Sequence, residues 1–261
     1  MSDLLQVDNL SKTFATGRGL PWNRRRVAAV DNVSLSVQRG RTLGLVGESG
    51  SGKSTLGRCI LGLAKPDRGQ ISFDGVEVQA LSGRALADFR RRVQPVFQDP
   101  YGSLDPRWPV GRSVRESLDC FRIGTPAERD RRVLDLFARV GLNPALADRL
   151  PTHLSGGQRQ RVGIAAALAS SPELIIADEP VSALDMSVQA QILNLFLDLQ
   201  QDLGLALIFI THDLGVVKHV SDNVAVMFRG SIVETGDTER IMSHPRHLYT
   251  RTLLAAVPRP R

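Results

Sequence analysis

The stretch Gly47–Thr55 carries the clearest chemistry in the chain. It reads Gly-Glu-Ser-Gly-Ser-Gly-Lys-Ser-Thr and fits the phosphate-loop pattern Gly-x-x-x-x-Gly-Lys-Ser/Thr. The glycines let successive backbone N–H groups turn inward around phosphate oxygens, and a helix that begins there adds its positive dipole end. We expect Lys53 to reach the β- and γ-phosphates and Ser54 to offer its hydroxyl to Mg²⁺. The pattern predicts a nucleoside triphosphate site, but it does not say what the energy is used for.

Two adjacent carboxylates, Asp178 and Glu179, follow the apolar run Leu174–Ala177. The run predicts a buried strand, and ligands of open α/β sheets bind at the carboxyl ends of strands. Phosphoryl transfer needs mainly positioning and charge neutralisation. We therefore expect Asp178 to hold Mg²⁺ through water and Glu179 to polarise the attacking water. The alternative is an acidic turn after a strand, and the phosphate loop in the same chain argues against it.

A second anion site is predicted at Leu154–Arg161, which contains Ser-Gly-Gly-Gln. Ser155 is a good N-cap for a following helix, and the two glycines after it expose backbone N–H groups. Alone, this pattern is only a loop-to-helix junction. Two anion sites in one chain are explained most simply by a dimer, in which each nucleotide lies between the phosphate loop of one subunit and this segment of the other.

The elements that must position these residues follow the pattern of a parallel α/β core. A short apolar strand is expected at Thr42–Val46, before the phosphate loop, and a helix at Leu56–Leu63, after it. A continuous apolar run, Leu205–Ile210, predicts a strand covered on both faces. The helix before that run has one apolar face and ends at Gly204.

Other patterns surround this core. Val33, Leu35 and Val37 alternate with polar residues, which predicts a half-buried strand among antiparallel strands in the first 40 residues. Residues 98–170 are helical in pattern, with a capping box beginning at Thr125 and a stop at Gly141. Turns and loops are expected in three further segments: the basic loop Gly17–Arg26, the hairpin Ile71–Val78 and the hairpin Val224–Thr235.

The composition limits the classes of protein to which the chain can belong. The 261 residues carry a net charge of +6, with 33 basic and 27 acidic residues. Arginine runs at 24–26 and 90–92 could attract nucleic acid or an anionic membrane face, but a solvated basic surface is the favoured interpretation. No apolar run approaches the roughly 20 residues of a spanning helix, and no secretory signal is visible, so we expect the chain to stay in the cytosol. Two cysteines, Cys59 and Cys120, predict neither a disulfide framework nor a zinc site.

The phosphate loop, Leu154–Gln158 and Ile175–Glu179, in this order and spacing, resemble the ATPase subunits of ABC transporters. The resemblance implies that Gln98 is the Q-loop glutamine, which reaches Mg²⁺ and the attacking water. It also implies that Asp185, in Ser182–Asp185, is the D-loop residue at the dimer seam.

Two further positions match motifs of that family. His212 resembles the switch histidine that contacts the γ-phosphate. Phe14 resembles the A-loop aromatic that stacks on adenine, with Trp22 as the less favoured candidate and a core role for Phe14 as the alternative.

A narrower resemblance concerns substrate class. The segments Phe97–Arg107, Ala177–Asp185 and His244–Thr250 resemble the dipeptide/oligopeptide/nickel import subfamily, and most of all its dipeptide-type ATPase subunit. In that subfamily the Q-loop region meets the coupling helix of the membrane subunits. The chain departs from the pattern at Ala166, where arginine is frequent, and at Leu248, where proline is usual. It also shows no C-terminal cysteine cluster, so an iron–sulfur site is not expected.

The resemblance implies a P-loop α/β core with an antiparallel β-subdomain and an inserted α-helical subdomain. We expect one ABC ATPase domain over residues 1–257: residues 1–97 carry the β-subdomain and phosphate loop, 98–170 the helical subdomain and 171–257 the rest of the core, before a frayed tail at 258–261.

The expected function is Mg²⁺-dependent ATP hydrolysis that energises import of peptides or a related small substrate. The chain would lie peripherally on the cytoplasmic face of the inner membrane. Its partners would be transmembrane permease subunits, a second identical or related ATPase subunit and, indirectly, a substrate-binding protein, with no nucleic acid. The alternatives are a soluble ABC ATPase that acts on nucleic acid or ribosomes, and an export or self-standing regulatory ATPase.

The residues expected to act follow from the motifs and the resemblance together. Catalytic roles are expected for Glu179, His212 and Gln98, and metal contacts for Ser54, Gln98 and Asp178. Nucleotide contacts are expected from Phe14, Gly47, Glu48, Ser49, Gly50, Ser51, Gly52, Lys53, Ser54, Thr55, Gln98, Ser155, Gly156, Gly157, Gln158, Asp178 and Asp185.

Overall fold

The computed structural model describes residues 3–16, 25–99 and 102–255. The chain divides into two compact units, Met1–Leu81 with Ala206–Arg261, and Ser82–Leu205. We call them unit 1 and unit 2. The subdomain boundaries predicted from the sequence fall after residues 97 and 170. They differ from the boundaries of these units and stay a prediction. Among the described residues, no helix is both long and apolar enough to cross a membrane.

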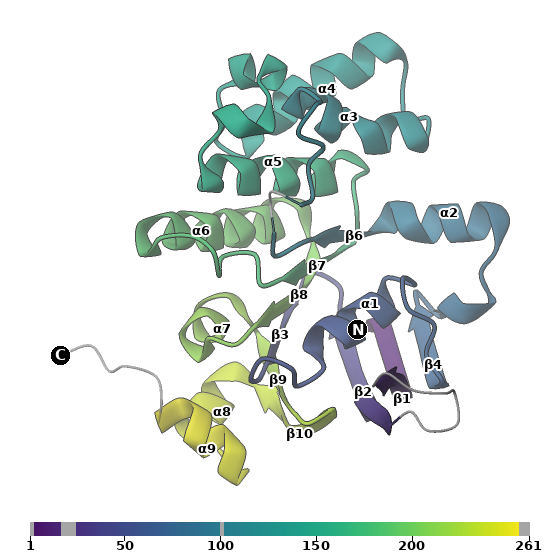
Figure 1. The fold of residues 1–261 in the computed structure, drawn as a ribbon, viewed down its shortest axis with the longest axis vertical. Coiled ribbons are helices and arrows are strands. Elements are labelled where there is room, and N and C mark those ends of the chain that lie inside the picture. Colours follow the sequence, from purple (N-terminus) through teal and green to yellow (C-terminus); the bar gives the residue numbers. More distant parts are fainter. Residues whose placement is uncertain (1–2, 17–24, 100–101, 256–261) are drawn as a thin grey trace. The chain divides into compact units, whose positions relative to one another are not determined.

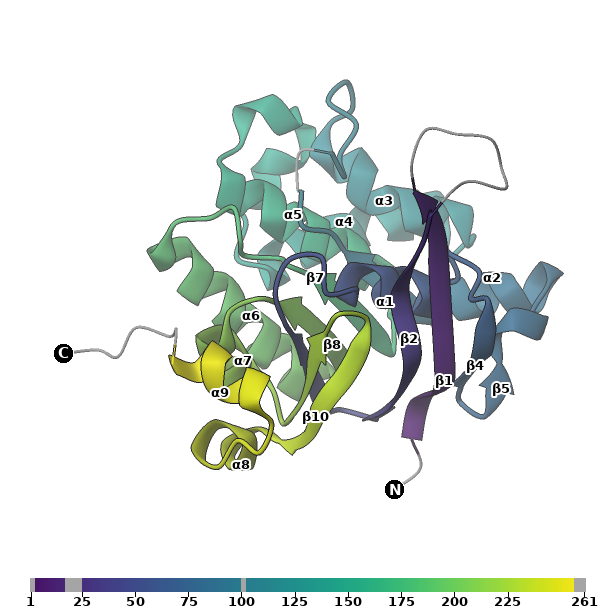
Figure 2. The ribbon, with the colours of Figure 1, turned by 60° about the horizontal axis from the view of Figure 1, so that its bottom comes forward.

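Unit 1 contains an antiparallel sheet whose strands follow the order β2-β1-β4-β5. Their bounds are β1 Asp3–Thr16, β2 Arg25–Gln38, β4 Arg68–Phe73 and β5 Val76–Glu77. The alternation predicted in β2 is confirmed, because Val33 and Val37 are buried while Ser34 and Ser36 are exposed. Figure 2 shows β1 and β2 as two long neighbouring strands.

Parallel strands form the second sheet of unit 1. β3 (Thr42–Val46) pairs in parallel with β8 (Ala206–Thr211) on one side and β9 (Asn223–Phe228) on the other. β10 (Ser231–Asp237) closes the edge as an antiparallel hairpin with β9. All residues of β3 and β8 are buried, as their continuous apolar runs predicted.

The described part of unit 1 contains four α-helices: α1 (Lys53–Ile60), α7 (Leu214–Val220), α8 (Thr238–Ser243) and α9 (Leu248–Ala255). One buried cluster joins β3, β9 and the last three of these helices, with Val46, Val217 and Tyr249 among its members. Figure 1 shows α8 beside the β9–β10 hairpin. The C-terminal helices are therefore packed against the strand that precedes the phosphate loop.

Unit 2 is mostly helical. It holds a parallel strand pair, β6 (Val93–Val96) and β7 (Leu174–Asp178), together with α2 (Gly83–Arg92), α3 (Val110–Cys120), α4 (Pro126–Arg139), α5 (Gly156–Ala169) and α6 (Met186–Leu203). Short 3-10 turns, η3 (Pro144–Asp148) and η4 (Pro151–His153), lead into α5. Helices α3 and α4 pack on α5, as Figure 1 shows.

Several boundaries differ from expectation. The helix after the phosphate loop begins at Lys53 and ends at Ile60, before the expected Leu63, because Gly62 takes a left-handed φ of 68°. Val78 begins a 3-10 turn, η2 (Val78–Ala80), instead of ending a strand. Of the expected basic loop, Arg25 and Arg26 lie in β2, and residues 17–24 fall outside the described residues.

Candidate nucleotide-binding and catalytic site

Unit 1 carries the phosphate loop between β3 and α1. Lys53 is 4% exposed, and its Nζ donates to the carbonyl oxygens of Gly47 at 2.7 Å and Glu48 at 2.8 Å. The lysine thus folds back over the loop and holds it closed. A positive charge in this buried position can be neutralised by a phosphate group at the same place.

At two positions of the loop, the neighbouring backbone leaves room only for glycine. Gly52 has a φ of 108°, and a Cβ atom there would lie 1.9 Å from the carbonyl oxygen of Ala29. A Cβ at Gly47 would lie 2.1 Å from the carbonyl oxygen of Met227. Backbone of β2 and β9 therefore approaches the loop so closely that a side chain is excluded at both positions.

In unit 2, the structure brings Gln98 and Glu179 into contact. The Gln98 side-chain Nε2 donates to Glu179 Oε2 at 3.0 Å and lies 3.4 Å from Ser182 Oγ. Glu179 directly follows β7, whose last residue is Asp178, and both carboxylates are half-buried. Glu179 also has a φ of 47°, which is uncommon for a non-glycine residue and often marks a functional position.

The start of α5 has the geometry that was predicted for it. Ser155 Oγ accepts from the backbone N–H of Gln158 at 3.3 Å, and the Gln158 side chain accepts from the Ser155 N–H at 2.9 Å. This capping box orders the first turn, whose N–H groups at Gly156 and Gly157 have no partner within the helix. The turn is therefore a candidate anion-binding surface.

Asp185 begins α6 next to that turn. Its carboxylate accepts from the Ser187 hydroxyl at 2.7 Å and from the Val188 N–H at 2.9 Å. These hydrogen bonds, the Ser187 hydroxyl first, hold the pKa of Asp185 below its usual range. A Cβ at Gly157 would lie 2.5 Å from Val188 Cγ1, so the glycine allows the first turns of α5 and α6 to approach closely.

The two remaining predicted residues lie in unit 1. Phe14 is on β1 and 44% exposed, with Lys12 Nζ 5.5 Å from its ring centroid. Its exposure argues against the core alternative and leaves the ring available for stacking. His212 is exposed at the end of β8, before α7. Trp22, the other candidate for stacking, lies outside the described residues.

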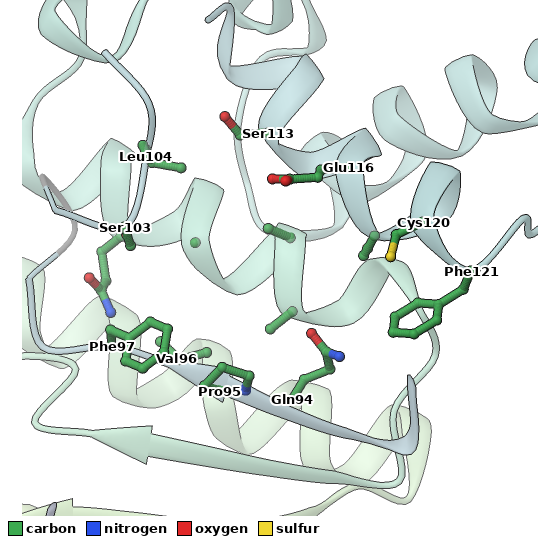
Figure 3. A pocket seen from close by; sticks show the side chains of 15 residues that line it. Gln94, Pro95, Val96, Phe97, Ser103, Leu104, Ser113, Glu116, Cys120 and Phe121 are labelled. Atoms are coloured by element: carbon green, nitrogen blue, oxygen red, sulfur yellow. The ribbon is translucent and has the colours of Figure 1, made fainter. Parts of the chain in front are cut away.

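A cavity beside Gln98 was not expected from the sequence. It has a volume of about 340 Å³ and lies in unit 2. Figure 3 shows Gln94, Pro95, Val96 and Phe97 along one side and Ser113 and Glu116 of α3 along the other. Gln160 and Ala166 of α5 also line it. The residues come from segments far apart in sequence, so only the folded chain reveals the cavity.

The donor set of the predicted site fits Mg²⁺ rather than a softer metal. The candidate ligands are the Ser54 hydroxyl, the Gln98 amide and the Asp178 carboxylate, all of which offer oxygen. The described part of the chain contains no group of three or more His, Cys, Asp or Glu side chains that could hold a metal alone. Mg²⁺ in such proteins is held by one or two side chains together with nucleotide phosphates and water.

Comparison with known proteins agrees with this geometry. Residues 30–182 match the ABC transporter family. The oligopeptide transport ATP-binding protein OppF of Streptococcus mutans is 48% identical over 258 residues, which cover 98% of this chain and 82% of that protein. The probable peptide ABC transporter ATP-binding protein y4tS of Sinorhizobium fredii is 50% identical over 262 residues, which cover 100% of this chain and 74% of that protein.

A solved structure shows the same fold. It is the dimeric, post-hydrolysis state of the ATP-binding cassette MJ0796 bound to ADP and Pi. It matches with a TM-score of 0.79 at 30% sequence identity, and the match covers 90% of this chain and 98% of that one. The chain therefore has the ABC ATPase fold and belongs to the ABC transporter family.

Proposed function

We propose that this chain is the ATP-hydrolysing subunit of an importer that moves peptides across the cytoplasmic membrane. The contact between Gln98 and Glu179, in a chain that also carries a closed phosphate loop, supports hydrolysis most directly. The transport role and the substrate class follow from the high identity with OppF and y4tS, which are described as peptide transport proteins.

In this proposal the loop Gly47–Thr55 binds the triphosphate through its N–H groups and Lys53. Phe14 stacks on adenine. Mg²⁺ would be held by Ser54, Gln98 and Asp178, and it supplies charge neutralisation at the phosphates when bound. Glu179 accepts a proton from the attacking water as general base.

A second subunit completes the proposed site. The capped turn of α5, with Ser155 and Gly157, would face the γ-phosphate bound by the partner chain, and Asp185 would lie at the seam. His212 would contact the γ-phosphate from the same chain as the phosphate loop. Binding of ATP would then close the dimer, and hydrolysis followed by release of phosphate would remove the γ-phosphate charge that holds it.

The cavity beside the Q-loop is the proposed contact with the membrane subunits. Its lining includes Val96, Phe97 and Leu104 next to the polar Ser113 and Gln160. A cavity lined by both apolar and polar residues can accept a short helix or loop of a membrane-spanning partner, whereas a flat surface of a partner could not enter it. Phe97, which lines the cavity, directly precedes Gln98, so movement of the partner would be passed to Gln98 through the chain. The substrate-binding protein would act only through the membrane subunits.

The test of this function is Glu179→Gln. We expect the variant to bind ATP normally, because the side-chain amide preserves shape, and to hydrolyse it more slowly by on the order of 100- to 10,000-fold, because the base is lost. ATP should then trap a dimer, which light scattering detects. Glu239→Gln, an exposed change on α8, is the control and should hydrolyse like wild type. Turnover by Glu179→Gln near the wild-type rate would refute the assignment.

A further inference from the structure

Tyr249 of α9 is held deep in unit 1. It is 8% exposed, and its ring lies 4.2 Å, centroid to centroid, from that of Phe228 at the end of β9. It also belongs to the buried cluster that contains Val46, the last residue of β3 before the phosphate loop. A tyrosine buried to this extent needs a partner for its hydroxyl group.

That partner is the phosphate loop itself. The backbone N–H of Glu48 donates to Tyr249 Oη at 3.0 Å, across 201 positions of sequence. Glu48 is the second residue of the loop, directly after Gly47 and two residues before Gly50. Burial raises the pKa of Tyr249, and its hydroxyl oxygen is the acceptor for this N–H.

The hydroxyl is fixed in place by the turn that precedes α9. Glu234 of β10 accepts from the backbone N–H groups of Arg246 at 2.8 Å and His247 at 3.0 Å. The N–H of Tyr249 in turn lies 3.2 Å from His247 Nδ1. The segment before α9 is thus attached to the β9–β10 hairpin by contacts that do not involve the phosphate loop.

The same hairpin also holds the middle of the loop. The N–H of Gly230, in the turn between β9 and β10, donates to the carbonyl oxygen of Ser51 at 2.9 Å. Between these two tethers lie Ser49 and Gly50, and Gly50 has a φ of 79° with no neighbour near its Cα hydrogens. Glycine-rich backbone loses much freedom when it is ordered, so external tethers reduce what nucleotide binding must order.

We propose that Tyr249 is a positioning residue for nucleotide binding, whose hydroxyl holds the first turn of the phosphate loop in its binding conformation. The proposal rests on the nucleotide site proposed above. It gives the C-terminal helix a direct effect on nucleotide affinity, although α9 contributes no group that would touch the nucleotide.

The test is Tyr249→Phe, which removes the hydroxyl and keeps the ring packed on Phe228. We expect the dissociation constants for ADP, ATP and tripolyphosphate to rise together by about three- to tenfold, because the loop loses one tether to a buried group. The KM for ATP should rise by the same factor while kcat at saturating ATP changes little. Amide hydrogen exchange of the peptide that contains Glu48 should accelerate, and exchange in β3 should not.

Thr252→Val is the matched control. It removes a hydroxyl from the same helix, where Thr252 Oγ1 donates to the Leu248 carbonyl oxygen, and it should leave the affinities unchanged. Tyr249→Leu removes the ring as well and should lower the melting temperature, which separates packing from positioning. Wild-type affinity and wild-type exchange at Glu48 in a folded Tyr249→Phe variant would overturn the proposal. Failure of the wild-type chain to bind any nucleotide would instead refute the proposed function.

Discussion

Glu179, the proposed general base, has a backbone conformation that is uncommon for a non-glycine residue. Its positive φ turns the backbone directly after β7, and Gln98 then holds its carboxylate through one hydrogen bond. A non-glycine residue in this conformation costs about 1 kcal/mol or more, which the buried strand before it can offset.

The proposed stacking of Phe14 on adenine can be tested by changing this one residue. Phe14→Ala should raise the dissociation constant for ATP about tenfold while leaving that for tripolyphosphate unchanged, since base–aromatic stacking contributes about 1–3 kcal/mol and involves no phosphate. Isothermal titration with the two ligands measures the difference.

The contrast with Tyr249→Phe, where both ligands should weaken together, separates the two halves of the site. Equal loss of ATP and tripolyphosphate affinity in Phe14→Ala would show that Phe14 acts through the structure of β1 instead of through adenine.

At the scale of elements, unit 2 contains two helices that begin with the same capping box. Thr125 and Glu128 cap α4, and Ser155 and Gln158 cap α5, each with both reciprocal hydrogen bonds. Only the second is proposed to face a nucleotide. Comparing the two capping boxes therefore separates the effect of a cap on stability from its effect on nucleotide binding.

Thr125→Ala and Ser155→Ala should each lower the free energy of unfolding by about 1 kcal/mol, because each removes the acceptor for an N–H of the first turn. Urea unfolding measures this loss. Only Ser155→Ala should also weaken ATP-driven dimerisation, assayed by light scattering in the Glu179→Gln background. If both variants dimerised equally well, the α5 turn would have no role beyond helix capping.

Local signals were enough to predict some elements. The α4 cap, the left-handed Gly141 that follows α4 and the left-handed Gly204 after α6 are set by residues a few positions apart, and all three expectations are confirmed. Helices α2 and α8 were missed because they are short and bury one or two residues, so few buried positions mark them in the sequence.

Site contacts depended instead on tertiary structure. The motifs identified Gln98 and Glu179 as residue types at suitable spacings, but their contact spans 81 positions and requires β6 and β7 to pair. The contact of Tyr249 with the phosphate loop spans 201 positions and has no local signal. Such contacts follow from strand order and packing, which no short sequence window contains.

At the scale of the whole molecule, the net charge is compatible with two kinds of partner, a nucleic acid or a membrane-spanning protein. A net charge of +6 and a pI of about 10 favour association with any polyanion, including nucleic acid. Such binding releases counterions, and its affinity falls steeply as salt rises. The cavity beside the Q-loop differs, because its lining includes Val96, Phe97, Leu104 and Ala167, and contacts with apolar groups are barely screened by salt.

These different effects of salt predict which partners are recovered when the chain is isolated from its native membranes in mild detergent. At about 0.5 M salt, copurified nucleic acid should be lost and membrane-spanning subunits retained, because screening removes exposed charge contacts and spares apolar ones. Gly163→Leu projects a side chain from α5 into the cavity and should lose those subunits, whereas Ala138→Leu on the exposed face of α4 should keep them. Retention of nucleic acid at this salt with no membrane subunit recovered would favour a soluble ABC ATPase that acts on nucleic acid, since only specific contacts to bases survive such screening.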